Sequence, residues 1–124
     1  MPVICGTAAP VFNQHHATFV GLASPSRGAT ETSVWRVILA SGAPAVEHFL
    51  DREEILVVTG GRAIVSLGGA AHDVATGDAI VVPPGEPFSL ANPYDGPLEA
   101  IAVLPVGGKG CLPGGAPFTP PWAE

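Results

Sequence analysis

Glycine and proline restrict the fold of this sequence more than any other feature, because together they supply 30 of its 124 residues. They recur at short intervals, so few uninterrupted runs are long enough for an ordinary helix. Between them lie short segments rich in β-branched and apolar residues, a pattern typical of strands separated by tight turns. The sequence therefore predicts an all-β protein, and no helical heptad or internal repeat competes with that prediction.

The length and charge of the chain narrow the class of protein further. A chain of 124 residues is the size of one domain, and its 47% hydrophobic and 13% charged residues favour a globular protein. Membrane binding is not expected, because no apolar run approaches the roughly 18 residues of a membrane helix. Nucleic acid binding is not expected either, because the net charge is −6 and the chain has only five Lys and Arg. The first residues do not resemble a secretory signal, so we expect a cytoplasmic protein.

The punctuation by glycine and proline divides the chain into an N-terminal arm (1–17), a barrel (18–106) and a Gly/Pro-rich tail (107–124). Within the barrel, the two runs on either side of residues 60–62 are expected to form a hairpin. The predicted strands are 18–23, 31–40, 45–50, 55–59, 63–67, 72–75, 79–82, 88–91 and 98–106. This number of short strands is typical of a sandwich or barrel.

Two features near the chain ends allow alternative interpretations. The tail contains Phe118 and Trp122, which we expect to dock on the barrel or on a second subunit, with a lid over a pocket as the alternative. Cys5 and Cys111 are expected to be reduced thiols, and a disulfide between them is the alternative.

The spacing of residues in the stretch 42–61 resembles a known motif. Gly42 is followed by five residues and His48, by one more and Leu50, by three more and Glu54, and by six more and Gly61. This pattern resembles the first motif of the cupin family. In that motif the positions that correspond to His48 and Leu50 are both histidines.

A later stretch resembles the second cupin motif. Gly77 is followed by five residues and Pro83, by one and Gly85, by two and Phe88, and by three and Asn92. The family's histidine falls at Phe88. Because every interval of both motifs is matched, the chain is identified as a small cupin.

The resemblance implies a double-stranded β-helix barrel of the jelly-roll type, commonly dimeric, with a pocket between its two sheets. In metal-binding cupins, the three histidines and the glutamate of the two motifs hold one Fe, Mn, Ni, Cu or Zn ion. Only His48 and Glu54 remain here, since Leu50 and Phe88 have no lone pair that coordinates a cation. No cofactor is therefore expected at this degenerate metal site. The alternative is a divalent metal held by His48 and Glu54 with rearranged ligands from His15, His16 or His72.

The same resemblance places His48 and Glu54 in a largely apolar cavity as candidate catalytic residues. Leu50, Phe88, Trp35 and Arg36 are the candidate substrate-binding residues, although Trp35 and Arg36 point to opposite faces of one strand. Burial would raise the pKa of the glutamate, whereas contact with the histidine would lower it. The sequence does not decide between these two effects.

Three functions follow from this cavity, and the sequence does not decide whether the chain is an enzyme. The first is a metal-independent cyclase, isomerase or lyase acting on a small apolar organic substrate, with acid–base work shared by the two polar residues. The second is a non-catalytic barrel that senses or carries a small molecule, and the third is a metalloenzyme with rearranged ligands. The two polar residues could also be remnants that bond to each other, and we expect a homodimer in each case.

Overall fold

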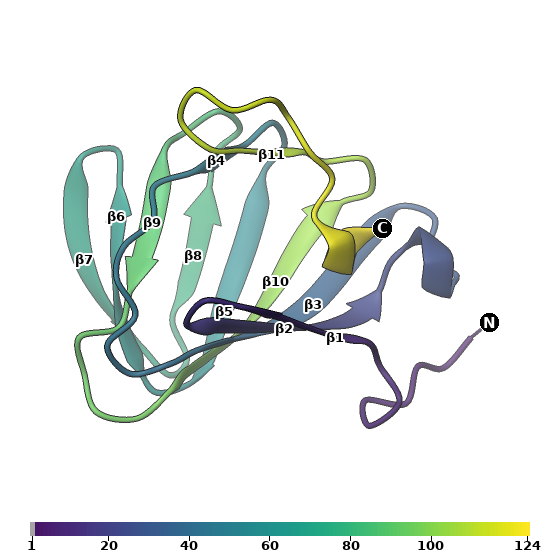
Figure 1. Cartoon of the computed structure of the whole chain (residues 1–124), viewed down its shortest axis with the longest axis horizontal. Helices are drawn as coiled ribbons and strands as arrows, with labels where there is room; N and C mark the ends of the chain where they lie inside the picture. The colour runs from purple at the N-terminus through teal and green to yellow at the C-terminus, as the bar shows by residue number, and fades with distance from the viewer. Residues whose placement is uncertain (1) are drawn as a thin grey trace.

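A computed structural model describes residues 2–124 and confirms an all-β chain (Figure 1). The helical content assigned within this range is two short 3-10 helices, η1 (Pro25–Arg27) and η2 (Pro121–Ala123). The strands are β1 (Val11–Gln14), β2 (Ala17–Ala23), β3 (Thr32–Leu39), β4 (Phe49–Leu50), β5 (Glu54–Gly60), β6 (Arg62–Leu67), β7 (Ala70–Ala75), β8 (Ala79–Val82), β9 (Phe88–Ala91), β10 (Leu98–Pro105) and β11 (Gly110–Cys111).

The strands form a jelly-roll barrel from two main sheets. One sheet has six strands in the order β1-β2-β3-β10-β5-β8, and the other has three in the order β7-β6-β9. The short strands β4 and β11 pair with each other. Figure 1 shows β7, β6 and β9 on one side of the molecule and the larger sheet on the other, with the C-terminal segment crossing one end.

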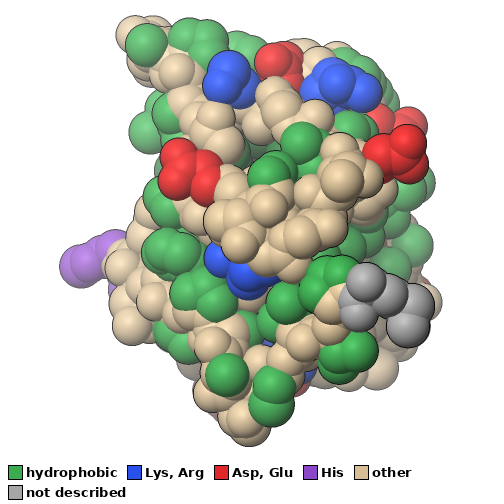
Figure 2. All heavy atoms as spheres, turned by 90° about the vertical axis from the view of Figure 1, so that its right-hand side faces the viewer, with side chains coloured by type: hydrophobic (Ala, Val, Ile, Leu, Met, Phe, Trp, Pro, Cys, Tyr) green, Lys and Arg blue, Asp and Glu red, His purple; other side chains and the backbone are tan. Residues whose placement is uncertain are grey.

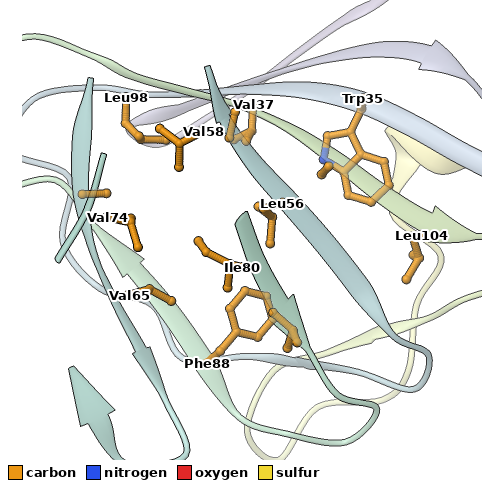
Figure 3. Packing of buried hydrophobic residues seen from close by; sticks show 14 of the residues in the cluster. Trp35, Val37, Leu56, Val58, Val65, Val74, Ile80, Phe88, Leu98 and Leu104 are labelled. Carbon is orange, nitrogen blue, oxygen red and sulfur yellow. The ribbon is translucent and has the colours of Figure 1, made fainter. Parts of the chain in front are cut away.

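The core lies between these sheets and follows from the period-two alternation of strand side chains. In β10 the buried positions are Leu98, Ala100, Ala102 and Leu104, and the positions between them are partly exposed. Figure 3 shows residues from β3, β5, β6, β8, β9 and β10 meeting in this interior. The barrel thus has one continuous apolar core.

The expected hairpin across residues 60–62 is wrong, although both of its arms are strands. β5 pairs with β10 and β8, whereas β6 pairs with β7 and β9, so the chain crosses from one sheet to the other at this point. Gly61 makes the crossing with φ +79°, and a Cβ there would lie 2.3 Å from the Pro97 carbonyl oxygen. The sequence signal of two apolar runs around a glycine pair does not distinguish a hairpin from such a corner.

Segments expected to lie outside the barrel contribute to it. β1, which falls in the expected arm, pairs with β2. β11, which falls in the expected tail, pairs with β4, and Gly110 forms a further bridge with Phe118. The predicted strand 45–50 is shorter than expected, because only Phe49–Leu50 is assigned as strand.

The C-terminal segment docks on the barrel through one aromatic side chain and several carbonyl groups. The Trp122 ring stacks on Phe19 with centroids 3.6 Å apart and planes 4° apart. The Ser33 hydroxyl donates to the Ala123 carbonyl oxygen at 3.2 Å, and Arg27 Nη2 donates to the Trp122 carbonyl oxygen at 3.2 Å. The expected docking of Trp122 on the barrel is therefore observed within the chain itself.

The cysteines, the surface charges and the helices were also the subject of sequence expectations. Cys5 is exposed and Cys111 is buried, and no disulfide joins them in the part of the chain that the structure describes. On the face shown in Figure 2, basic and acidic side chains are interspersed and form no basic stripe. No helix within residues 2–124 is long and apolar enough to span a membrane.

Removing the Trp122 ring is expected to destabilise the protein. Trp122 is 8% exposed, and truncation of a buried aromatic ring leaves a cavity. We predict that Trp122→Ala lowers the free energy of unfolding by about 3 kcal/mol in urea denaturation. The matched control Phe118→Ala, whose side chain is 43% exposed, should lose less. Equal losses in the two variants would contradict the docking role of Trp122.

The two-residue turn between β1 and β2 carries backbone strain at one position. His16 has φ +66°, and it is the one non-glycine residue within 2–124 in this region. A side chain in this region costs about 1–2 kcal/mol of stability. Glycine removes this cost, but its greater flexibility in the unfolded state cancels part of the gain. We predict that His16→Gly raises the melting temperature, whereas His15→Gly lowers it because His15 is not in this region. Thermal unfolding of both variants measures the difference, and stabilisation by His15→Gly alone would contradict it.

Candidate active site

A cavity of about 400 Å³ opens between the two sheets and contains the candidate residues. This volume lies within the range of small-molecule sites, roughly 300–1,000 Å³. Its walls are mainly apolar, and its polar side chains come from one glutamate, one glutamine and three histidines. No Lys or Arg is among the described residues that line it. The lining is Gln14, His15, His16, Ala17, Phe19, Trp35, Val37, Leu39, Ala43, Pro44, Val46, His48, Leu50, Glu54, Leu56, Phe88, Leu90, Gly110, Leu112, Phe118, Pro120 and Trp122.

Glu54 brings a carboxyl group into this apolar interior. It is the first residue of β5, whose alternation directs Glu54, Leu56 and Val58 inward. The three residues before it are exposed, and its partner across the sheet is Val82. The Glu54 side chain is 5% exposed, and no side-chain hydrogen bond or ion pair to it is found within residues 2–124.

Burial is the physical cause of an altered acidity at this position. Removing the carboxylate from water without a compensating cation disfavours its charged form. Burial therefore raises the pKa of the Glu54 carboxyl from 4.5 to about 8. Of the two opposing effects left open by the sequence, desolvation prevails, and Glu54 is a protonated acid at neutral pH.

His48 is held in place through both its backbone and its ring. Its backbone N–H donates to the Phe88 carbonyl oxygen at 3.0 Å, and the Phe88 backbone N–H donates to the His48 carbonyl oxygen at 2.8 Å. His48 Nδ1 lies 2.9 Å from the Val46 carbonyl oxygen. A carbonyl oxygen only accepts, so Nδ1 carries the hydrogen in this contact, which leaves Nε2 as the acceptor of the neutral tautomer. The His48 and Phe88 rings pack with centroids 4.3 Å apart.

Leu50 and Phe88 complete the four positions that the two motifs bring together. Leu50 lies on β4 and Phe88 on β9, and both are buried in the cavity wall beside His48 and Glu54. The spacing of the motifs therefore predicted which side chains would meet.

This donor set does not fit the metal site of the family. A mid-row metal ion usually needs three or four protein ligands. Of the four motif positions, two have side chains that can coordinate, and within residues 2–124 no three His, Cys, Asp or Glu gather closely enough to hold an ion. His72 lies on β7 beside a separate hollow rather than this cavity. We derive no chemical step through a metal.

The structure separates the two adjacent candidates on β3. Trp35 is buried and lines the cavity, and Figure 3 shows its ring directed into the interior with Leu56 and Phe88. Arg36 alternates to the opposite face of the sheet and does not line the cavity. The structure thus gives Arg36 no contact with a ligand in this cavity.

Several lining residues were not among the candidates. Phe19 lies on β2, and Phe118 and Trp122 lie in the C-terminal segment, so both ends of the chain contribute walls. The two aromatic residues in the tail were the signal that could have identified this wall. The alternative interpretation of Phe118 and Trp122, a lid over a pocket, placed them beside the cavity. His15 and His16 line the cavity from the β1–β2 turn, where the sequence offered only a choice between a metal ligand and a solvated loop.

Comparison with solved structures shows the same fold in proteins of different activities. The polyketide cyclase RemF from Streptomyces resistomycificus matches with a TM-score of 0.76 at 20% identity, covering 85% of this chain and 79% of that chain. A cupin sugar phosphate isomerase from Silicibacter pomeroyi matches with a TM-score of 0.74 at 16% identity, covering 90% and 81%. KdgF from Halomonas sp. matches with a TM-score of 0.73 at 17% identity, covering 84% and 94%.

Comparison at the level of sequence identifies a family but no individual relative. No curated protein matches this chain. The family model described as "Cupin domain" matches residues 35–104, more than half of the chain. This range contains both motifs and four of the cavity's aromatic and polar residues, Trp35, His48, Glu54 and Phe88. On this match and on the barrel described above, the chain belongs to the cupin family.

Proposed function

We propose that this cupin performs metal-independent acid–base chemistry on a small, neutral, largely apolar organic molecule. The observation that carries the proposal is Glu54, a buried carboxyl without a counter-ion whose pKa is raised to about 8. A group with a pKa near the working pH is suited to proton transfer, and such tuning typically marks catalytic sites.

The two polar groups have complementary roles in proton transfer. Protonated Glu54 can donate a hydrogen bond, and then its proton, to a substrate carbonyl oxygen. His48 Nε2 can take the proton from the carbon next to that carbonyl. The electron pair of the broken C–H bond then forms the double bond of an enol, and the return of both protons restores the catalyst. Enolisation of this kind is the step that cyclisation, isomerisation and dehydration share.

The lining of the cavity favours neutral over anionic ligands. Because no described lining residue is Lys or Arg, a phosphate or carboxylate would lose its hydration without a counter-ion. An ionised Glu54 would repel it as well. This chemistry resembles what the name polyketide cyclase implies more closely than what the name sugar phosphate isomerase implies. A role as a non-catalytic carrier or sensor makes the same demand on the ligand but forms no product.

Exchange of carbon-bound hydrogen is a direct test of the proposed proton transfer. We predict that the protein accelerates hydrogen–deuterium exchange next to the carbonyl of 2-tetralone, an apolar ketone, in D₂O as followed by ¹H NMR. Removing a general acid or base typically costs 10² to 10⁴ in rate, so His48→Ala and Glu54→Gln should each slow exchange by about 10²-fold. Glu53→Gln, on the exposed adjacent residue, is the matched control and should retain the wild-type rate. Wild-type exchange rates in both site variants would contradict the proposal. Binding of 2-tetralone without accelerated exchange would favour the role of a carrier.

The raised pKa of Glu54 also predicts how stability depends on pH. Between about 4.5 and about 8, the native state keeps the Glu54 proton while the unfolded state has lost it. The native state binds more protons in this window, so stability falls as pH rises through it and levels off above about 8. Relative to Glu54→Gln, the wild type should lose about 4 kcal/mol between pH 5 and pH 9. Urea denaturation at several pH values measures this loss, which the control Glu53→Gln should share with the wild type.

A pair of matched probes tests the preference for neutral ligands. 2-Naphthol and 2-naphthoate share one ring system, but the second is anionic at pH 6.5. We predict that 2-naphthol binds at least about tenfold more tightly, as measured by quenching of tryptophan fluorescence, since one uncompensated charge costs at least that much. Tighter binding of the naphthoate would contradict the assignment of a neutral substrate.

A further inference from the structure

The indole N–H of Trp35 is a buried hydrogen-bond donor for which the described chain supplies no acceptor. Trp35 lies on β3 and is 4% exposed, and its Nε1 forms no hydrogen bond within residues 2–124. A buried Trp N–H usually has a partner, because the indole nitrogen only donates and loses its water on burial. This donor is therefore left for an acceptor that residues 2–124 do not contain.

The surface that remains open to this donor is that of the cavity. Within residues 2–124, Arg27 Nε is the one fully enclosed side-chain nitrogen or oxygen without a partner. Trp35 Nε1 and the Glu54 carboxyl oxygens also lack partners, but they are not fully enclosed. Both side chains line the cavity, and Figure 3 shows the indole nitrogen on the side of its ring toward Val37 and Leu56. A molecule in the cavity can therefore reach two separate donors.

The strand register shows how the two donors are spaced. Trp35 on β3 pairs with Ala102 on β10, and Ala102 pairs with Leu56 on β5. Glu54 precedes Leu56 by two residues on β5, so both point to the same side of the sheet. Because neighbouring strands are about 4.8 Å apart, the two donors rise from strands about 10 Å apart. The methyl group of Ala102 does not rise between them, so both face one space at a separation that suits two acceptor atoms.

We propose that Trp35 Nε1–H is a specificity-determining donor that recognises a second uncharged oxygen on the substrate. This inference rests on the proposed function, in which protonated Glu54 donates to the carbonyl group that undergoes enolisation. The second oxygen belongs to a carbonyl, ether or hydroxyl group at the opposite end of the same molecule. The substrate class thus narrows from an apolar ketone to an apolar ring compound with two oxygen acceptors, one for each donor.

The chemistry of the indole determines which group it selects. The indole N–H is uncharged and accepts no hydrogen bond, so it favours an acceptor over a cation or a second donor. A site that buries a donor for one substrate group rejects analogues that lack this group, because the donor is then left unpaired. Two fused six-membered rings with an oxygen at each end bridge the strand that lies between the two donors.

Trp122 carries the other indole of the chain and provides a control. Its ring stacks on Phe19 of β2 with centroids 3.6 Å apart. In the sheet, β2 lies on the side of β3 away from β10 and β5, so Trp122 lies one strand farther from Glu54 than Trp35 does. The strand order therefore assigns the second acceptor to Trp35.

Two ketones that differ in one oxygen test this assignment at pH 6.5. The compound trans-decalin-2,6-dione has a carbonyl group at each end of two fused rings, whereas trans-2-decalone has only one. The dione should move the Trp35 Nε1–H signal of the ¹⁵N-labelled wild type downfield, and 2-decalone should move it less. The spectrum of Trp122→Phe, which retains one indole, assigns the signal. A Trp35 signal that the bound dione leaves unmoved would overturn the inference.

Affinities from isothermal titration calorimetry measure the strength of the same contact. Trp35→Phe keeps an apolar ring but removes the N–H, so it should weaken binding of the dione by about fivefold relative to 2-decalone. Trp122→Phe, the matched control, should leave the ratio of the two Kd values unchanged. An unchanged ratio in Trp35→Phe, or a changed ratio in Trp122→Phe alone, would contradict the assignment. If circular dichroism shows that Trp35→Phe does not fold, the wild-type spectra decide.

These outcomes are separable from a failure of the proposed function. Neither the indole signal nor the Kd ratio depends on turnover, so both support the Trp35 contact even in a protein that only carries the molecule. Absence of hydrogen exchange with an intact Trp35 contact would contradict the acid–base proposal alone. Binding of neither ketone would overturn both proposals.

Discussion

The burial of one carboxyl group in an apolar barrel is the constraint on which the site depends. Glu54 enters the interior because it begins a strand whose alternate residues are buried, so its position is set by the same pattern that forms the core. No described cation compensates it, and the consequence is a proton retained at neutral pH. In a metal-binding relative the corresponding glutamate would be stabilised as an anion by the ion, so replacement of two ligand positions changes the chemistry of a residue that is itself unchanged.

Apolar replacements at two ligand positions have a second effect on the cavity. Leu50 and Phe88 fill space with carbon where imidazoles would bring donors, acceptors and water. The Phe88 ring lies against His48, and its backbone fixes the histidine through two hydrogen bonds. The residue at one ligand position of the motifs therefore positions the residue at another, and the cavity places an apolar wall beside His48 and Glu54.

The sequence predicted the fold and the centre of the site because both depend on short-range spacing. Turn glycines and alternating apolar residues define the strands, and the motif intervals correctly brought His48, Leu50, Glu54 and Phe88 together. Strand pairing was less predictable, since the signal around Gly61 is the same for a hairpin and for a corner between sheets. The walls from Phe19 and Trp122 depend on contacts between distant segments, which no local pattern encodes. Whether burial or ion pairing has the larger effect on the pKa of Glu54 likewise required the three-dimensional structure.

The way the C-terminal segment is attached has a consequence for the evolution of specificity. It is held largely through backbone carbonyl oxygens, which accept hydrogen bonds from the hydroxyls of Ser24, Ser26 and Ser33. Its side chains Leu112 and Phe118 line the cavity but take no part in these hydrogen bonds, and both are more than 40% exposed. The shape of the binding site can therefore diverge at these two positions while the attachment of the segment is conserved. Related barrels can vary this wall of the cavity without altering His48 and Glu54.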